Sequence, residues 1–272
     1  MHEVRPQVLT SLSLFVGTGV CNANCPHCAG VVHRKFAPQK DGVLNEELIT
    51  KTLRACYKDG ARYLTLSSGG EPTLSPRAVA RTLEIVSELK KEGIVYAPIN
   101  LYSNGIRIGR SAKFASQVLP KWKALGLACV YVTVHDTDAK KNAEVYGVKF
   151  YPSLKEIILR IHKAGILMRA NLVLSKSTVS TAEKFIRSVI YLKNIGADSI
   201  SAWPVRGEDD RPDKENVPPE EEMDKMDAWI ALENSLDFKI RLLRERDREV
   251  YQEGRKLTLF PDGTLSGTWC NH

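Results

Sequence analysis

Short apolar runs alternate with longer amphipathic stretches along most of the chain. The runs are five to nine residues long and resemble strands buried on both faces, whereas the amphipathic stretches repeat with helical spacing. We expect Asn45 to cap the first helix and Pro120 to break or kink the third. The predicted strands cover 12–16, 62–67, 94–102, 127–134, 166–174 and 198–205, and the predicted helices cover 45–59, 76–92, 111–125, 153–164 and 181–194.

A glycine follows each predicted helix and indicates where it ends, because the residue after a helix often adopts a left-handed conformation. The regular alternation of strand and helix predicts repeated right-handed βα units. Six strands of this kind suit an α/β fold, a partial (β/α)6 TIM-like barrel that remains open. The glycines are Gly60, Gly93, Gly126, Gly165 and Gly196.

The chain changes character near its C-terminal end. Residues 207–222 are rich in acids and proline and predict a linker, and apolar residues at helical spacing predict a helix over 219–234. The stretch 256–267 has the pattern of two strands joined by a turn at Asp262-Gly263. We therefore expect a barrel over 1–206 and, over 207–272, an extension made of an acidic linker, a helix and a β-hairpin tail.

The net charge of +7 is unevenly distributed over the 272 residues. Residues 208–227 contain ten acids and three bases, so this segment carries −7 and the remainder of the chain carries +14. A basic body can attract an anionic substrate, a nucleic acid or an acidic redox partner, although lysine-rich outer helices that solvate a barrel would give the same balance.

Membrane and secretion signals do not stand out. No run approaches the roughly 20 apolar residues that a membrane span needs, and residues 1–6 do not resemble a signal peptide. We expect a cytoplasmic protein, because that compartment keeps thiols reduced.

Three of the six cysteines lie within eight residues, in the stretch Cys21-Asn-Ala-Asn-Cys25-Pro-His-Cys28 that follows the first predicted strand. Three thiolates can ligate three irons of a [4Fe–4S] cluster and leave the fourth iron open to a ligand. A disulfide would leave one thiol over. A zinc site that adds His27 or His33 is a chemical alternative, although a second pair of ligands is missing nearby.

This cysteine stretch resembles the cluster loop of the radical S-adenosylmethionine (SAM) superfamily. A second stretch, Gly69-Gly70-Glu71-Pro72 after the second predicted strand, resembles the GGEP element of the same family. The resemblance covers roughly residues 9–205. It implies a partial barrel in which a [4Fe–4S] cluster binds SAM, cleaves it reductively and yields a 5′-deoxyadenosyl radical that abstracts hydrogen from a substrate.

The resemblance also implies site residues at the ends of the strands, where the chemistry of βα barrels gathers. Gly69 and Gly70 allow close approach to a ligand, Glu71 is expected to accept from the SAM amino group, and His27 is expected near the adenine. Three of the expected site residues also have a structural interpretation. Asn104 would serve as a turn residue, Arg169 would form an ion pair with an acid, and His135 would cap a strand. The other expected cofactor contacts are Pro72, Ser103, Asn104, Thr133, Arg169 and Asn171, and the expected substrate contacts are His135 and Cys270.

The remaining cysteines are not expected to hold a second cluster. Cys56 lies on the apolar face of the first predicted helix and Cys129 lies inside a predicted buried strand, so both are expected in the core. Cys270 has only His272 nearby, and two ligands cannot hold such a cluster.

The substrate is predicted only as a small molecule or a peptide. Alternatives within enzymes are an activating enzyme for glycyl-radical proteins and an RNA-modifying enzyme, and a non-catalytic zinc or Fe–S binding module is the alternative outside enzymes. The resemblance implies SAM and a [4Fe–4S] cluster as cofactors and a one-electron donor of the flavodoxin or ferredoxin type as a partner.

Overall fold

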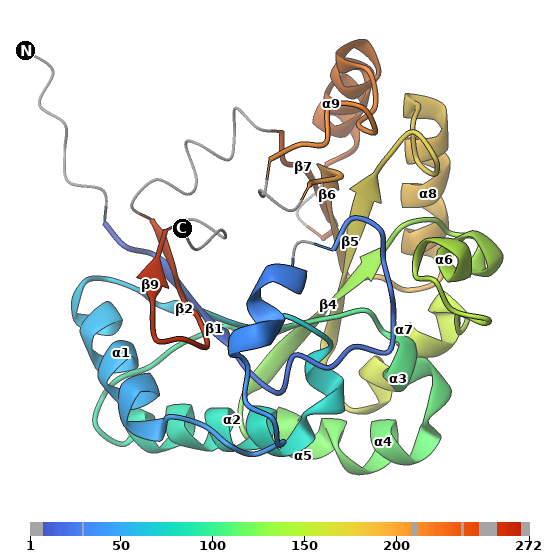
Figure 1. Ribbon diagram of the computed structural model, residues 1–272. Helices are drawn as coiled ribbons and strands as arrows, with labels where there is room; N and C mark the ends of the chain where they lie inside the picture. The colour runs from blue at the N-terminus through green and yellow to red at the C-terminus, as the bar shows by residue number, and fades with distance from the viewer. Residues whose placement is uncertain (1–7, 29, 208–210, 235–236, 245–254, 268–272) are drawn as a thin grey trace, which may run out of the picture.

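One open sheet forms the centre of the computed structural model, which describes residues 8–28, 30–207, 211–234, 237–244 and 255–267 (Figure 1). Its nine strands follow the order β7-β6-β5-β4-β3-β2-β1-β8-β9. Neighbouring strands run parallel, except that β8 and β9 run antiparallel. The strands are β1 Ser11–Phe15, β2 Tyr63–Ser67, β3 Ile99–Ser103, β4 Leu127–Val134, β5 Leu167–Leu174, β6 Ser199–Pro204, β7 Lys239–Leu242, β8 Lys256–Leu259 and β9 Leu265–Ser266.

Helices cover the outer face of this curved sheet (Figure 1). The strands turn alternate residues towards them, and Val130, Val132 and Val134 of β4 are fully buried on that side. None of the helices in the described ranges has both the length and the apolar character required to cross a membrane. The helices are α1 Glu46–Lys58, α2 Pro76–Lys90, α3 Ile106–Arg110, α4 Ala112–Gln117, α5 Leu119–Ala124, α6 Ala139–Val145, α7 Leu154–Lys163, α8 Ala182–Asn194 and α9 Glu220–Glu233, with 3₁₀ helices η1 Val31–Phe36 and η2 Pro72–Leu74.

The predicted α/β partial barrel is confirmed, and its sheet is not closed. Asn45 caps α1 by accepting a hydrogen bond from the backbone of Leu48, as predicted. Each predicted glycine stop has a positive φ, from 72° at Gly165 to 109° at Gly60. These positions need glycine because a side chain there would force a strained left-handed backbone.

Several elements differ from the prediction. The third strand begins at Ile99 rather than residue 94, because Pro98 precedes it and proline cannot donate to a ladder. The predicted third helix is divided at Val118 into α4 and α5, with Pro120 in the first turn of α5, so the predicted break in this helix is confirmed. The short helices α3 and α6 and the strand β7 were not predicted.

The C-terminal segment extends both edges of the barrel sheet. Strand β7 pairs with β6, and β8 pairs with β1 through register partners such as Ser11 and Lys256. The predicted helix and hairpin are confirmed as α9 and as β8 with β9. The division into 1–206 and 207–272 stays a prediction, because the described strands form one continuous sheet.

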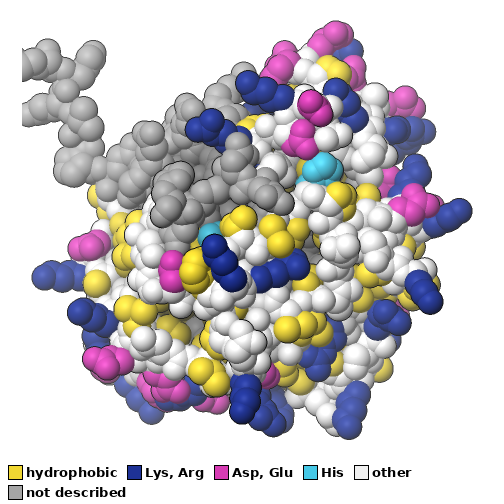
Figure 2. Space-filling view, viewed as in Figure 1, with side chains coloured by type: hydrophobic (Ala, Val, Ile, Leu, Met, Phe, Trp, Pro, Cys, Tyr) yellow, Lys and Arg dark blue, Asp and Glu magenta, His cyan; other side chains and the backbone are white. Residues whose placement is uncertain are grey.

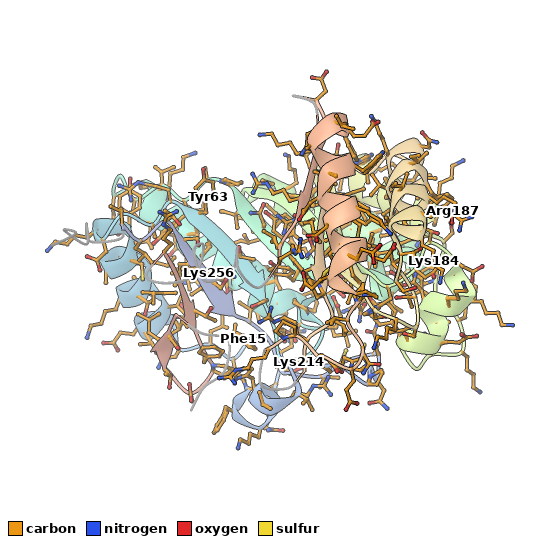
Figure 3. The ribbon with its side chains drawn as sticks, turned by 90° about the horizontal axis from the view of Figure 1, so that it is seen from above. Phe15, Tyr63, Lys184, Arg187, Lys214 and Lys256 are labelled. Carbon is orange, nitrogen blue, oxygen red and sulfur yellow. The ribbon has the colours of Figure 1, made fainter. Side chains whose placement is uncertain are left out.

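An aromatic cluster joins the hairpin to the N-terminal part of the chain. The ring of Phe260 stacks on His33 with centroids 4.5 Å apart, and His33 meets Phe15 edge-on at 5.0 Å. Only 1% of His33 is exposed, so this contact lies inside the molecule. The view from above in Figure 3 shows Phe15 at the end of β1, beside the strand that carries Lys256.

The inner face of the sheet, which lies opposite the outer helices, is polar and partly open to solvent on β4. Cys129, Tyr131 and Thr133 alternate along this face and are all half-buried. The prediction that Cys129 is a buried core residue is therefore wrong. A continuous apolar run does not reveal which residues turn towards the helices and which turn towards the inner face.

Candidate active site

The loop after β1 carries Cys21, Cys25 and Cys28 as free, half-buried thiols. Its start is fixed at Gly17, which has φ 88° and where an added Cβ would lie only 2.6 Å from the side chain of Ser75. The Ser75 hydroxyl accepts a hydrogen bond from the backbone of Thr18 at 3.1 Å. The loop that carries the three thiols is thus anchored to the turn before α2.

The two glycines after β2 pack directly against this loop. A Cβ on Gly70 would lie 2.3 Å from the carbonyl oxygens of Gly19 and Val20, and the backbone N–H of Glu71 donates to the Val20 oxygen at 2.9 Å. A Cβ on Gly69 would lie 3.0 Å from the Gly30 oxygen. Gly69 and Gly70 were expected to allow close approach to a ligand. In this structure they allow the backbone of the cysteine loop to approach closely.

Glu71 is the centre of a buried hydrogen-bond network, with only 2% of its surface exposed. Its carboxylate accepts from the backbone and hydroxyl of Thr73 at 3.0 and 2.6 Å, from the Ser103 hydroxyl at 2.8 Å and from the Asn104 backbone at 2.7 Å. Burial raises the pKa of Glu71, and the donors from Asn104 and Thr73 oppose that shift. The network joins the ends of β2 and β3.

Asn104 connects this network to the cysteine loop. Its side-chain amide donates to the Asn22 oxygen at 2.7 Å and lies 3.9 Å from the Cys21 sulfur. Its own side-chain oxygen accepts from the backbone of Ile106 at 3.0 Å, and its backbone oxygen accepts from Tyr151 at 2.9 Å. The end of β3 therefore supports the first cysteine.

Arg34 on η1 supports the third cysteine and was not among the predicted site residues. Its Nη2 lies 3.2 Å from the Cys28 sulfur, and its Nε donates to the Gly69 oxygen at 2.8 Å. The guanidinium thus holds the cysteine loop against the glycine pair. Arg34 lies in a polar stretch between two predicted elements, so no periodic pattern indicated which way its side chain would point. The available signal was its position, six residues after the last cysteine of the loop.

The electrostatics of the loop fit an iron–sulfur cluster. Burial, together with negative charge on Cys28 and Cys21, raises the pKa of Cys25 to about 12, which indicates that the three sulfurs lie near one another. No Asp or Glu lies between residues 8 and 40, whereas Arg34, Lys35 and Lys40 do. The charge of Arg34 acts to lower the pKa of Cys21 and Cys25, whereas the charge of Glu71 acts to raise that of Cys21, so Arg34 is the group that favours the anionic cluster that thiolates hold.

The donor set is also of the right type. Within the described ranges, no three His, Cys, Asp or Glu side chains are grouped to hold one metal ion. In a [4Fe–4S] cluster each thiolate ligates its own iron, so the sulfurs need not meet at one point. Three free thiols on one loop, one of them 3.2 Å from a guanidinium, suit such a cluster.

Two histidines lie on the rim of this site. The Nδ1 atom of His27 lies 3.3 Å from a carboxylate oxygen of Asp213, which belongs to the acidic segment. Burial lowers the pKa of His135 to about 4, with a further contribution from the charge of His27, so His135 is neutral at pH 7. His135 packs edge-on against Tyr146 at 4.8 Å, and the Tyr146 hydroxyl donates to the Thr133 oxygen at 2.8 Å.

Arg169 and Asn171 lie on the inner face of β5, two residues apart as predicted. The Nε of Arg169 donates to the Asn171 side-chain oxygen at 3.0 Å, and its guanidinium carbon lies 3.2 Å from the ring centroid of Tyr131. Asn171 pairs in register with Thr133 of β4. The structure therefore brings the predicted residues of β4 and β5 together.

A sequence profile described as the radical SAM superfamily matches residues 15–214, which is most of the chain. The chain belongs to the radical SAM superfamily. It is therefore an enzyme whose cofactors are SAM and a [4Fe–4S] cluster, and such enzymes need an electron donor and a substrate. A relative from Sulfurisphaera tokodaii (strain DSM 16993 / JCM 10545 / NBRC 100140 / 7), named probable GTP 3′,8-cyclase, is 30% identical over 174 residues, which is 64% of this chain and 50% of the relative.

Solved radical SAM structures share the fold. SuiB of Streptococcus suis with bound SAM has a TM-score of 0.63 at 16% identity and covers 96% of this chain and 58% of its own. HydG, a maturase of the [FeFe]-hydrogenase, has a TM-score of 0.66 at 12% identity, with 96% and 58% covered. Since this chain spans about half of its curated relative, the activity of the whole relative does not transfer to it directly.

Several predictions about the radical SAM site stay predictions. The structure gives the carboxylate of Glu71 four donors from the protein itself, so contact with the amino group of SAM would have to compete with them. Pro72 is buried at the start of η2. Cys270 and His272 lie outside the described residues. The substrate contact predicted for Cys270 and the expectation that no second cluster forms there therefore stay predictions.

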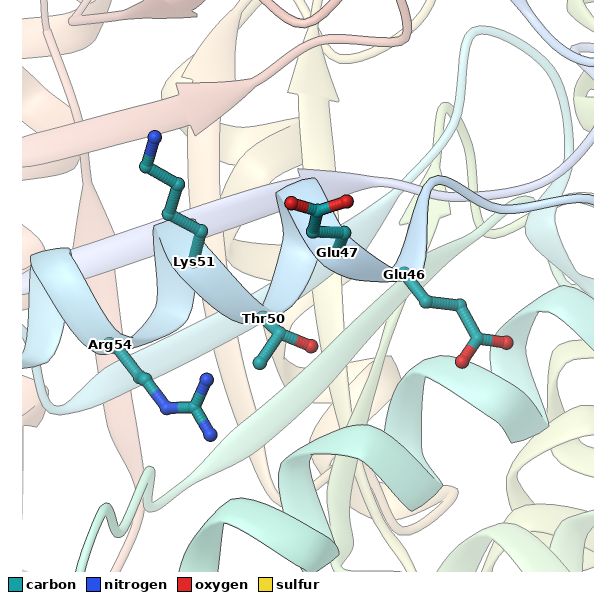
Figure 4. A pocket seen from close by; sticks show the side chains of 5 residues that line it. All are labelled: Glu46, Glu47, Thr50, Lys51 and Arg54. Carbon is teal, nitrogen blue, oxygen red and sulfur yellow. The ribbon is translucent and has the colours of Figure 1, made fainter.

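One surface hollow lies away from these residues (Figure 4). It has a volume of about 480 Å³ and is lined by Glu46, Glu47, Thr50, Lys51 and Arg54 of α1. Glu46 pairs with Arg81 at 2.8 Å and Arg54 pairs with Glu92 at 2.8 Å, so these charges already have partners in the protein. The hollow has no part in the predicted chemistry.

Proposed function

We propose that Cys21, Cys25 and Cys28 hold the [4Fe–4S] cluster and that the enzyme cleaves SAM reductively there to abstract hydrogen from a small-molecule or peptide substrate. The observation that carries the proposal is the interlock between the cysteine loop and the segment 69–71. Gly70 leaves no room for a Cβ beside Gly19 and Val20, and Arg34 bonds to both Cys28 and Gly69.

The residues of the chain would position the cofactors as follows. Arg34 donates to the thiolate of Cys28, and Asn104 supports Cys21 from the other side. Thr133 and Asn171 would contact SAM from β4 and β5, and His135, which is neutral at pH 7, would add no positive charge to a site for a cationic cofactor. When bound, the cluster and SAM supply the one-electron cleavage that gives a 5′-deoxyadenosyl radical.

The electron donor would approach beside η1. Val20, Val31, Val32 and Phe36 are exposed there, from 37% at Val32 to 60% at Val20, although they adjoin the cysteine loop. Lys35 lies over the Phe36 ring at 4.8 Å and adds positive charge. An apolar patch with basic neighbours suits an acidic carrier of the flavodoxin or ferredoxin type.

A guanosine nucleotide is the first substrate to test, because the name of the Sulfurisphaera tokodaii relative contains GTP. RNA modification has less support. Figure 2 shows Lys and Arg side chains scattered over the visible part of this face rather than gathered into one patch. A nucleic-acid site usually presents such a patch.

The test is anaerobic reconstitution with iron and sulfide, followed by reduction with dithionite and chromatography of the products of SAM. The parent protein should bind about four irons and release 5′-deoxyadenosine and methionine. A variant with Cys21, Cys25 and Cys28 all replaced by Ala should bind no cluster, whereas Cys129→Ala, a matched control outside the loop, should bind it normally. Equal iron and sulfide in the triple variant would show that these cysteines do not hold the cluster.

A further inference from the structure

A second hollow lies on the side of the sheet that the helices cover, between α3 and α4 (Figure 1). Its volume of about 190 Å³ is below the roughly 300–1,000 Å³ of pockets that enclose a whole drug-sized molecule. The hollow therefore suits a single small chemical group. It is lined by Arg107, Ser111, Lys113, Phe114, Gln117 and Val118.

The charge around this hollow is positive. Residues 93–135, which include α3, α4 and α5, contain five bases and no Asp or Glu. Helix α7 packs against both α3 and α4, and its one acid, Glu156, contacts Arg160 at 2.6 Å. Neither Arg107 nor Lys113 has an ion-pair partner among the residues that the structure describes. A bound anion would therefore offset charge that the surrounding protein leaves in place.

Arg107 is half-buried and held in position without an acid. Its Nη1 donates to the backbone oxygen of Thr73, and its guanidinium lies over the ring of Phe114 at 4.5 Å. A guanidinium has five N–H donors, and the donation to Thr73 is the one hydrogen bond of this side chain within the described ranges. A guanidinium that is already oriented and still has donors suits an oxyanion, which can accept two parallel hydrogen bonds from it.

The other polar side chains of the hollow are also donors. Lys113 is exposed and adds an ammonium group, and Gln117 adds an amide. The Ser111 hydroxyl accepts from the backbone of Phe114 at 3.1 Å, and its own hydrogen has no acceptor among the described residues. Donors on several sides match the three oxygens of a phosphate group better than the two oxygens of a carboxylate.

Arg107 also connects the hollow to the cysteine loop. Thr73, whose backbone oxygen it contacts, donates to Glu71 through its own backbone and hydroxyl. Glu71 in turn accepts from the backbone of Asn104, whose side-chain amide lies 3.9 Å from the Cys21 sulfur. An anion that fixes Arg107 therefore fixes one end of the network that supports the first cysteine.

We propose that Arg107, Ser111 and Lys113 bind a phosphate group and that the bound phosphate stabilises the Glu71 network. The phosphate is either free inorganic phosphate or the phosphate of a small metabolite whose remainder extends out of the hollow. The site lies apart from the inner face of the sheet, where the predicted contacts of β4 and β5 with SAM lie. It goes beyond the proposed function and does not depend on it.

The experiment measures binding of two probes, inorganic phosphate and glycerol 2-phosphate, to the full chain with and without the reconstituted cluster. Calorimetry is performed on the parent, Arg107→Gln and Lys113→Gln. The side chain of Lys113 makes no described contact, so this variant tests the site even if Arg107→Gln fails to fold. Arg187→Gln is the matched control, because it removes one positive charge from α8, where the side chain is 67% exposed and distant from α4 (Figure 1).

We expect at least one probe to bind with a dissociation constant of about 1 mM or less. Arg107→Gln should weaken binding about tenfold or more, as for the loss of a charged hydrogen bond, and Lys113→Gln about threefold. Arg187→Gln should leave it within about 1.5-fold, because salt screens distant charges. Weaker binding in the parent, which would indicate an adventitious ion only, or equal losses in all three variants would overturn the proposal. Preference for one probe identifies the source of the phosphate.

Hydrogen exchange at the backbone amides of Thr73 and Asn104 measures the effect on the Glu71 network, because both amides donate to that carboxylate. At a probe concentration of ten times the dissociation constant, exchange should slow by up to about elevenfold in the parent. Saturable binding without slower exchange would overturn the link to the network and leave the phosphate site standing. Phosphate binding by a protein that never cleaves SAM would overturn the proposed function alone.

Discussion

Replacement of Glu71 by Gln tests the network that joins the cysteine loop to β2 and β3. The carboxylate has four donors, and two of them, the backbone N–H groups of Asn104 and Thr73, cannot rotate away. Gln offers one oxygen and one NH₂ group in the same volume. In the best orientation the Gln oxygen still accepts from Thr73 and Ser103, and the NH₂ group then faces the backbone N–H of Asn104. That N–H loses its acceptor, and Asn104 is only 8% exposed.

The expected cost combines a buried N–H without an acceptor and the loss of charge from the remaining hydrogen bonds. Together these reduce the free energy of unfolding by about 2–4 kcal/mol, a large part of the ~5–15 kcal/mol typical of a domain. Urea unfolding at pH 7 measures the difference. Glu47→Gln on the exposed surface of α1 is the control and should change stability by about 0.5 kcal/mol or less.

A loss below about 1 kcal/mol in Glu71→Gln would contradict this reasoning. Since burial raises the pKa of Glu71, that result would mean that the carboxyl is held protonated, in the state that Gln imitates. A loss that disappears when the cluster is loaded would instead show that the cluster, rather than Glu71, holds the loop.

Three further predictions concern Gly70, His135 and Cys270. Gly70→Ala should destabilise the cysteine loop, because its Cβ would lie 2.3 Å from two carbonyl oxygens of that loop. The iron content after reconstitution should therefore fall. An unchanged iron content would show that the loop can move aside. The pKa of His135, about 4, lies below the ~6.5 of the unfolded chain, so its stabilisation is present above pH 6.5 and is lost as pH falls to about 4. Unfolding titrations should show this loss, up to about 3 kcal/mol, in the parent but not in His135→Gln. Cys270→Ala should keep its full iron content, and a fall of several irons per chain would reveal a second cluster.

The main elements could be predicted because their signals are local. Strands such as β4 are apolar runs, and Asn45 and Gly60 mark helix ends by their own backbone preferences. The short elements could not, because α3 and β7 have five and four residues, too few for a periodic pattern. Their formation depends on partners that are distant in sequence.

The site was predictable only as far as its motifs extend. The cysteines and the segment 69–72 have recognisable spacing, but Arg34 contacts Cys28 only because η1 turns back towards the loop. The placement of β7 beside β6 depends on strand pairing, which no local pattern indicates. The glycine pair was found, yet its contact with the cysteine loop needed the three-dimensional structure.

The pairing of β1 with β8 has a consequence for synthesis on the ribosome. Thr10 and Arg255 are hydrogen-bonded across 245 residues, so β1 emerges long before its outer neighbour exists. Until β8 is synthesised, the outer edge of β1 has no partner strand. The outer edge of β6 likewise has no partner until β7 is synthesised. Exposed edges invite pairing with other chains, so the nascent protein is vulnerable to aggregation for most of its translation. Shortening the chain at its C-terminal end should therefore impair solubility before it impairs the local structure around the cysteines.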